Sequence, residues 1–204
     1  MGFYERQVLP RLIDWSLGTP EILAHRQRVT AGLAGAVVEI GFGSGLNVPF
    51  LPASVTRLYG IDPCEVGRGL AAKRIAQTDV AVEFAGLDGQ RIELPDASAD
   101  MALSTFTLCT IPDAHAALEE VKRVLRPGGV MHFLEHGRSP DAGVARWQDR
   151  LNPMHRRIGG GCNLNRTMDV LVRDAGFELI ALENFSVSWP RPYGYMYMGR
   201  ARRA

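Results

Sequence analysis

The chain has 204 residues, of which 46% are hydrophobic, so it can bury a sizeable core and is expected to form one domain. Its 23 basic and 22 acidic side chains give a formal net charge of +1, which disfavours nucleic acid as a partner. The three cysteines are far apart and no apolar run is long enough to cross a bilayer, so we expect a cytoplasmic protein without a transmembrane segment.

The first 34 residues predict two short helices. Apolar side chains recur at helical spacing on both sides of Gly18, and Thr19 and Pro20 provide a cap and a first-turn proline for the second helix. One interpretation is a helical lid that closes over a ligand, and the other is simple packing of the apolar face into the core.

Residues 36–136 alternate between strand-like and helix-like segments. Strands are predicted at 37–40, 57–62, 80–86, 99–106 and 130–136. Helices are predicted at 46–52, 64–77 and 113–125, and residues 126–129 (Arg-Pro-Gly-Gly) have the composition of a type II turn. This alternation favours a Rossmann-like α/β fold with a mostly parallel sheet.

The remaining residues predict helices at 142–157 and 165–175 and strands at 177–189 and 193–201. The last two strands are too closely connected for a crossover helix, so they should form a hairpin at an antiparallel C-terminal edge of the sheet.

A glycine-rich turn follows the first predicted strand. Gly41, Gly43 and Gly45 lie between a strand and a helix start, where glycine permits a tight turn and close approach of a nucleotide-like ligand. The spacing G-x-G-x-G is shorter than the G-x-G-x-x-G dinucleotide fingerprint. Glu39 would bring a carboxylate close to a pyrophosphate, so the ligand should carry positive charge rather than be a nicotinamide dinucleotide.

Acidic residues follow the next two strands. Asp62, followed by Pro63, stands about 20 residues after the glycine turn, where a carboxylate can accept both hydroxyl groups of a ribose. Asp88 and Gly89 follow the third strand, where they could contact an adenine. Each motif alone also fits a structural turn or a helix cap, and it is their order that indicates a nucleoside cofactor.

The motifs VVEIGFGSG, YGID, AGLDGQ, LSTFTLCTIPD and RVLRPGGVMHFLEH, in this order, resemble the class I S-adenosylmethionine-dependent methyltransferases. The resemblance is to the branch that contains ubiquinone/menaquinone-type C-methyltransferases. A narrower likeness, carried by FTLCTIPD, FLEHGRS, GGGCNLNR and RPYGYMYMGRA, is to bacterial relatives of the alkyl thiol methyltransferases.

The resemblance implies S-adenosyl-L-methionine as cofactor and S-adenosyl-L-homocysteine as product. It places the glycine turn beneath the methionine part, Asp62 on the ribose and Asp88 with Gly89 beside adenine, and Arg26 could pair with the methionine carboxylate. The residues expected to bind the cofactor are Glu39, Gly41, Gly43, Gly45, Asn47, Asp62, Pro63, Asp88, Gly89, Ser104 and Thr105.

The resemblance also divides the chain into a helical lid (1–34), a cofactor-binding half (35–137) and acceptor-side helices with the C-terminal hairpin (138–204). Glu135 and His136 end the fifth predicted strand, where open α/β sheets build their ligand crevice, and they are the catalytic candidates. The simpler alternative for His136 is a histidine bonded to backbone. His132 lies about 13 Å from His136 along a strand, so these two cannot share a metal ion and none is expected.

The residues expected to contact the methyl acceptor are Tyr4, Cys109, Cys162 and Asn163. Cys109 stands where related methyltransferases often have histidine, and a buried cysteine is more often part of a pocket wall than a nucleophile. Asn163 could equally bind a ligand or cap a helix.

The favoured function is methyl transfer to a small molecule, with a thiol as the preferred acceptor. The alternatives are C- or N-methylation of a quinone precursor or a phospholipid headgroup, and a cofactor-binding protein without catalysis. The sequence does not predict the oligomeric state.

Overall fold

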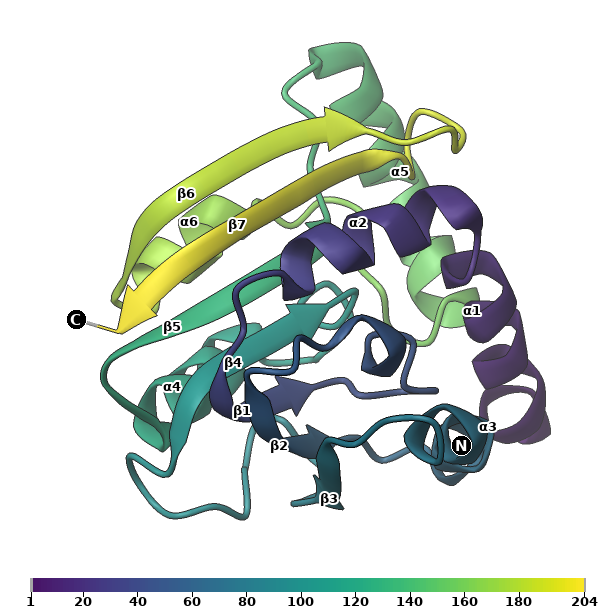
Figure 1. The fold of residues 1–204 in the computed structure, drawn as a ribbon. Coiled ribbons are helices and arrows are strands. Elements are labelled where there is room, and N and C mark those ends of the chain that lie inside the picture. Colours follow the sequence, from purple (N-terminus) through teal and green to yellow (C-terminus); the bar gives the residue numbers. More distant parts are fainter. Residues whose placement is uncertain (1, 204) are drawn as a thin grey trace.

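A computed structural model describes residues 2–203 as one seven-stranded sheet with helices on both faces (Figure 1). The strands are β1 (Gly35–Ile40), β2 (Val55–Ile61), β3 (Ala81–Phe84), β4 (Ala99–Thr105), β5 (Leu125–His136), β6 (Phe177–Ser186) and β7 (Tyr195–Arg203). The helices are η1 (Tyr4–Val8), α1 (Leu9–Leu17), α2 (Pro20–Thr30), η2 (Val48–Phe50), α3 (Glu65–Ile75), α4 (Ala114–Val124), α5 (Ala142–Ile158) and α6 (Met168–Asp174).

The strand order is β3-β2-β1-β4-β5-β7-β6. Strands β1 to β5 are parallel to one another, whereas β7 pairs antiparallel with both β5 and β6. This confirms the predicted Rossmann-like sheet with an antiparallel C-terminal hairpin. The order reverses between β1 and β4, and ligands of open α/β sheets bind beside the carboxyl ends of strands at such a point.

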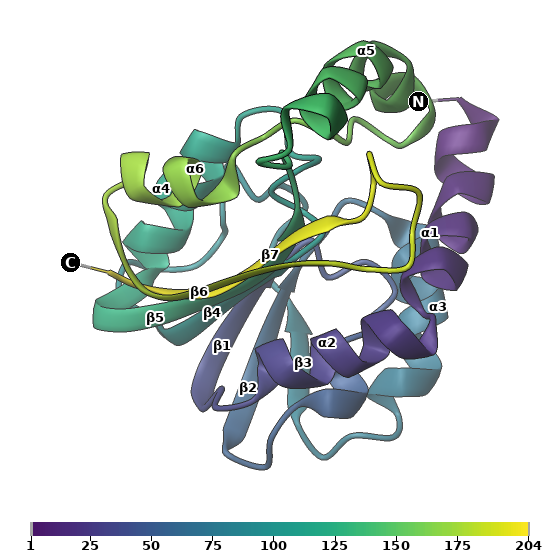
Figure 2. The ribbon, with the colours of Figure 1, turned by 90° about the horizontal axis from the view of Figure 1, so that it is seen from above.

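Strand β1 shows why the sheet is covered on both faces. Successive side chains of a strand point to opposite sides, and all the apolar side chains from Val37 to Ile40 are buried. Val38 and Ile40 belong to the core cluster that includes α4 and α6, whereas Val37 packs in a second cluster with Val29 of α2. Figure 2 shows α4, α5 and α6 on one side of the sheet and α2 on the other.

The N-terminal helices contact both the sheet and α3. Ile22 and Val29 of α2 are buried, and Asp14 of α1 forms a 3.0 Å ion pair with Arg74 of α3. In Figures 1 and 2, α1 lies beyond the end of the sheet where β1 and β4 finish. Between residues 2 and 203, the structure contains no helix with the length and apolarity that a membrane span needs.

Three predicted elements differ from the structure. The helix predicted at 46–52 is only the 3₁₀ turn η2, because Pro49 and Pro52 lack the N–H groups that a continuing helix needs. Residues 126–129 lie inside β5 rather than in a separate turn, although Gly128 has the positive φ of 77° that a type II turn requires. The last helix begins at Met168, not at residue 165.

Candidate active site

The glycine turn after β1 is fixed by a carboxylate at the end of β2. Gly41, Gly43 and Gly45 have φ values of 70°, 55° and 71°, a region that glycine adopts without strain. The Gly43 N–H donates to Asp62 Oδ2 at 2.8 Å, and the Cys64 N–H donates to Asp62 Oδ1 at 2.7 Å. Burial raises the pKa of Asp62, and these two backbone hydrogen bonds oppose the rise. Asp62 therefore shapes the turn at which the sequence predicts a ribose.

Glu39 presents an unsatisfied oxygen inside the protein. Its side chain is 1% exposed, and Oε1 accepts a 2.6 Å hydrogen bond from Asn47, whereas Oε2 has no partner among the described residues. Burial raises the pKa of Glu39 to about 8. A buried carboxylate oxygen without a partner is costly, so it fits a cationic or hydrogen-bond-donating ligand group.

Arg26 of α2 is the positive counterpart of Glu39. The guanidinium donates to Asn47 Oδ1 at 2.8 Å and to Thr105 Oγ1 at 2.9 Å. Burial lowers its pKa to about 10, so it stays charged at neutral pH. Asn47 lies between Glu39 and Arg26, and this pair of opposite charges suits the ammonium and carboxylate groups of an amino acid. The structure thus brings together Glu39, Asn47 and Thr105 from the predicted set.

Glu135 organises the loop after β4, and its catalytic role stays a prediction. It is fully buried, and Oε1 accepts hydrogen bonds from Ser104 Oγ at 2.7 Å and from the N–H groups of Thr107 and Leu108 at 3.0 and 3.1 Å. Oε2 accepts from the Cys109 N–H at 3.4 Å. Burial raises the pKa of Glu135 against these hydrogen bonds. The Ser104 hydroxyl is directed to Glu135, and its contact with the methionine end of the cofactor stays a prediction.

The residues expected beside adenine lie nearer the surface. Asp88 is exposed, and its Oδ1 accepts a 2.8 Å hydrogen bond from the Gln90 N–H in a local turn. Gly89 faces Ile40 and Ile111, because a Cβ on Gly89 would lie 3.1 Å from Ile111 Cδ1. This apolar strip suits the face of a planar ring. Pro63 is also exposed.

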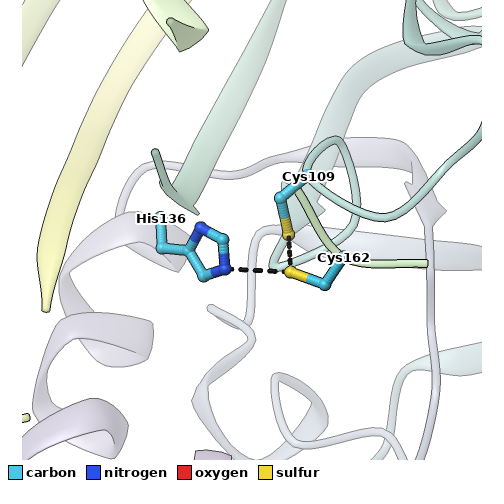
Figure 3. Close-up of side chains that lie close together, drawn as sticks. All are labelled: Cys109, His136 and Cys162. Carbon is cyan, nitrogen blue, oxygen red and sulfur yellow. Dashed lines mark hydrogen bonds between the residues drawn. The ribbon is translucent and has the colours of Figure 1, made fainter. Parts of the chain in front are cut away.

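Three candidate acceptor-side residues form one buried cluster, shown in Figure 3. The Sγ atoms of Cys109 and Cys162 are 3.3 Å apart, and Cys162 Sγ is 2.9 Å from His136 Nε2. The hydrogen bond with Cys109 lowers the pKa of Cys162, as does the charge of His136. Burial alone would lower the pKa of His136, but the negative charge of Cys162 raises it. Both shifts favour a thiolate on Cys162 and a protonated His136 when the two side chains face each other.

The loop that carries Cys162 is held against the loop that carries Cys109. Asn163 donates from its backbone N–H at 2.8 Å and from Nδ2 at 3.0 Å to the Cys109 carbonyl. Gly161, with φ at 94°, lies so close that a Cβ would be 3.2 Å from the Thr110 carbonyl oxygen. Asn163 thus has a demonstrated structural role in joining the two loops.

Tyr4 and His132 lie away from the cysteine cluster. The Tyr4 hydroxyl donates to the Ile158 carbonyl at 2.9 Å, so Tyr4 joins the N-terminal segment to α5, and 40% of it is exposed. His132 Nδ1 bonds to the Val29 carbonyl at 2.7 Å, on the side of α2. Neither side chain belongs to the cysteine cluster.

Sequence reasoning missed two residues beside the cluster. His155 of α5 forms a hydrogen bond that helps to lower the pKa of Cys162, and its ring lies 6.4 Å from that of His136. Arg166 donates to the carbonyls of Leu108 and Ile111 and so supports the loop of Cys109. No spacing in the sequence signals the contacts of Arg166, because they join segments more than 50 residues apart.

Comparisons with known proteins agree with this geometry. Residues 38–133 match the family described as Methyltransferase domain. The chain is 34% identical over 183 residues to Thiol S-methyltransferase TMT1B from Homo sapiens, an alignment that covers 83% of this chain and 73% of that protein. The chain belongs to the class I S-adenosylmethionine-dependent methyltransferases. It is thus an enzyme that uses S-adenosylmethionine, and Glu39 and Arg26 fit the charged groups at the methionine end of that cofactor.

Two further proteins are similar to this methyltransferase. Thiol S-methyltransferase TMT1A from Homo sapiens is 32% identical over 179 residues, which are 81% of this chain and 72% of that protein. A solved structure from Thermotoga maritima, described as a SAM-dependent methyltransferase and possible histamine N-methyltransferase, has a TM-score of 0.71. It covers 98% of each chain at 23% identity, which supports the fold alone.

Proposed function

We propose that this methyltransferase methylates the sulfur of a small thiol. The observation that carries the proposal is the pairing of Cys162 with His136 at the carboxyl end of β5, on the edge of the sheet where the glycine turn also lies. A protonated imidazole such as that of His136 favours the ionised form of a thiol placed beside it. The similarity to two human thiol S-methyltransferases supports the same acceptor atom.

We infer the following division of labour. Bound S-adenosylmethionine supplies an electrophilic methyl group on a sulfonium. Glu39 and Arg26 hold the two charged groups of its methionine part, and Asp62 fixes the glycine turn and holds the ribose. Glu135 positions the loop that carries Cys109, so its role is one of positioning.

The acceptor side then has to align a sulfur atom with the methyl group and remove a proton. A free thiol has a pKa near 8.5 and is already a few per cent ionised at neutral pH, so a moderate shift is enough. We assign that shift to the group of Cys109, His136 and Cys162. These residues are 1%, 7% and 9% exposed, so the acceptor that reaches them has to be small.

The test measures S-adenosylhomocysteine formed by the purified protein with S-adenosylmethionine and a small alkyl thiol. The matched acceptor is the alcohol of the same carbon skeleton, and a reaction without acceptor gives the background. Product above background with the thiol and not with the alcohol supports the proposal. Product with a quinol or an aminophospholipid, and none with alkyl thiols, would overturn it.

Asp62→Ala serves as the matched variant in this assay. It removes charge-assisted hydrogen bonds worth about 1.5–3 kcal/mol each, so cofactor affinity should fall at least tenfold. Thiol-dependent product should fall with it at limiting cofactor concentration. If the variant binds S-adenosylhomocysteine as tightly as the parent in calorimetry, Asp62 does not hold the cofactor.

A further inference from the structure

Cys109, His136 and Cys162 have the composition of a transition-metal site. Their three ligand atoms all lie within 4.8 Å of one another, and no other group of this kind is found among residues 2–203. Two thiolate sulfurs and one imidazole nitrogen are the donors that Zn²⁺ prefers, and Cys₂His with one open position is a known arrangement for catalytic zinc. The sequence-based expectation of no metal considered only His132 and His136 and took no account of the cysteines.

The distances fit one ion with small movements. Zinc lies about 2.3 Å from sulfur and 2.0–2.1 Å from nitrogen, so tetrahedral ligand atoms are roughly 3.3–3.8 Å apart. In the cluster, Cys162 Sγ is 3.3 Å from Cys109 Sγ and 2.9 Å from His136 Nε2. Figure 3 shows that Cys162 stands between the other two, with the Nε2 edge of His136 turned toward it. Side-chain rotations that move these atoms apart by about half an ångström would admit the ion.

The surroundings hold the ligands in place. His136 Nε2 faces Cys162 Sγ at 2.9 Å, and the backbone of His136 is fixed in the sheet by pairing with Met196 of β7. The Cys109 N–H donates to Glu135, and the Cys109 carbonyl accepts from Asn163, so both ends of this residue are fixed. Outer hydrogen bonds of this kind orient metal ligands and are part of most metal sites.

Charge also favours a dication in this position. The thiolate of Cys162 and a second thiolate at Cys109 would neutralise a divalent ion, with His136 as a neutral ligand. A buried neutral assembly avoids the large cost of an unpaired charge.

We propose that Cys109, His136 and Cys162 bind a thiophilic divalent metal ion with one coordination position open. Zinc is the ion that these ligands fit best. This goes beyond thiol methylation as such, and its consequence for the reaction rests on the proposed function. If the protein methylates thiols, the acceptor thiol occupies the open position. A metal–sulfur bond then forms, and the thiol proton leaves to solvent. The bond breaks when the sulfur takes the methyl group, because a thioether is a weaker ligand. The metal, rather than His136 as a base, then ionises the thiol.

The experiment is metal analysis of the purified full chain, after incubation with zinc and removal of excess ion by a weak chelator. One zinc per chain is expected. Cys109→Ser and Cys162→Ser should each lose most of it. The controls are Cys64→Ser, which changes the third cysteine, and His115→Gln, which changes an exposed histidine, and both should keep one zinc per chain.

A second measurement keeps the test valid if a variant loses its fold. Cobalt added to the parent should give a thiolate-to-metal charge-transfer band and the visible bands of a tetrahedral ion, and zinc should displace them. Absence of both bound zinc and this spectrum in the reduced parent protein would overturn the proposal. So would equal zinc binding by Cys109→Ser, Cys162→Ser and the parent, provided that all of them bind S-adenosylhomocysteine.

The competing use of two neighbouring thiols is a disulfide. Thiol counting after denaturation without reductant distinguishes the two: three free thiols agree with the metal site, and one free thiol means that Cys109 and Cys162 are oxidised to a disulfide, which would overturn it. None of these readouts depends on turnover. Thiol methylation can therefore fail while the metal site stands, and the reverse also holds.

Discussion

The two sides of the active site are built from different kinds of sequence information. On the cofactor side, Glu39, Asn47 and Asp62 lie within 25 residues and are joined by the adjacent strands β1 and β2. On the acceptor side, Cys109, His136 and Cys162 lie on separate segments, and Cys109 and Cys162 are 53 residues apart. A short spacing motif can specify the first arrangement, whereas only the complete fold produces the second.

The two sides also meet at one point. Gly41 begins the glycine turn, and a Cβ there would lie 1.8 Å from Thr107 Oγ1 in the loop after β4. That loop is held by Glu135 and continues to Cys109. The absence of a side chain at Gly41 therefore allows the acceptor loop to approach the cofactor turn, and its substitution should affect both sides.

The largest effect on cofactor affinity is expected for Gly41→Ala. The positive φ of 70° costs about 1–2 kcal/mol in a residue with a Cβ, and the overlap with Thr107 adds to it. We expect the free energy of unfolding to fall by at least about 2 kcal/mol and affinity for S-adenosylhomocysteine to fall more than tenfold. Denaturant unfolding and calorimetry measure the two quantities.

Gly43→Ala is the matched control. Its φ of 55° carries the same kind of strain, but the nearest atom to an added Cβ is 3.9 Å away. It should lose only about 1–2 kcal/mol of stability. Equal losses in both variants would mean that backbone strain, and not the contact with Thr107, makes glycine necessary at position 41.

The sequence predicted the cofactor side better for the same physical reason. Buried strands, the glycine turn and an acid at the next strand end are local patterns, and the structure places them as a unit. The helix predicted at 46–52 does not form, because two prolines lack the N–H groups that a continuing helix needs, whatever the apolar pattern. Glu135 was identified, but the burial and backbone donors that give it a positioning role depend on a loop that no local pattern describes. The meeting of Cys109 with Cys162 is likewise a tertiary contact.

A pH experiment on Glu39 tests the charge that the cofactor side buries. Its pKa is about 8 in the folded protein and near 4.5 when exposed, so the folded state holds a proton that the unfolded state has lost between these values. The stability linked to Glu39 is full below about pH 4.5 and is lost as pH rises to about 8, by up to about 5 kcal/mol. In Glu39→Gln this part of the pH dependence of unfolding should disappear.

Ligand binding should show the opposite trend. An ammonium group beside Glu39 favours its ionised form, so affinity for S-adenosylhomocysteine should rise as pH approaches 8, with proton release on binding at lower pH. Calorimetry in buffers of different ionisation enthalpy measures that proton. Methylthioadenosine, which lacks the amino-acid group, is the matched ligand and should release none. Equal proton release with both ligands would remove Glu39 from the methionine end.

The smallest effect on cofactor affinity is expected for His136→Gln, which addresses the acceptor side alone. The variant removes the cation beside Cys162, so the pKa of that thiol should rise, as followed by thiolate absorbance during a pH titration. Affinity for S-adenosylhomocysteine should change less than about threefold, because Glu39, Arg26 and Asp62 do not depend on the imidazole. Methyl transfer should be slower, with a steeper rise toward alkaline pH as thiol ionisation becomes limiting.

A loss of cofactor affinity as large as that of Gly41→Ala would mean that the two sides form one cooperative unit. Unaltered turnover between about pH 6 and 9 would instead make His136 a structural residue, because a group that ionises the acceptor must leave its mark on that profile.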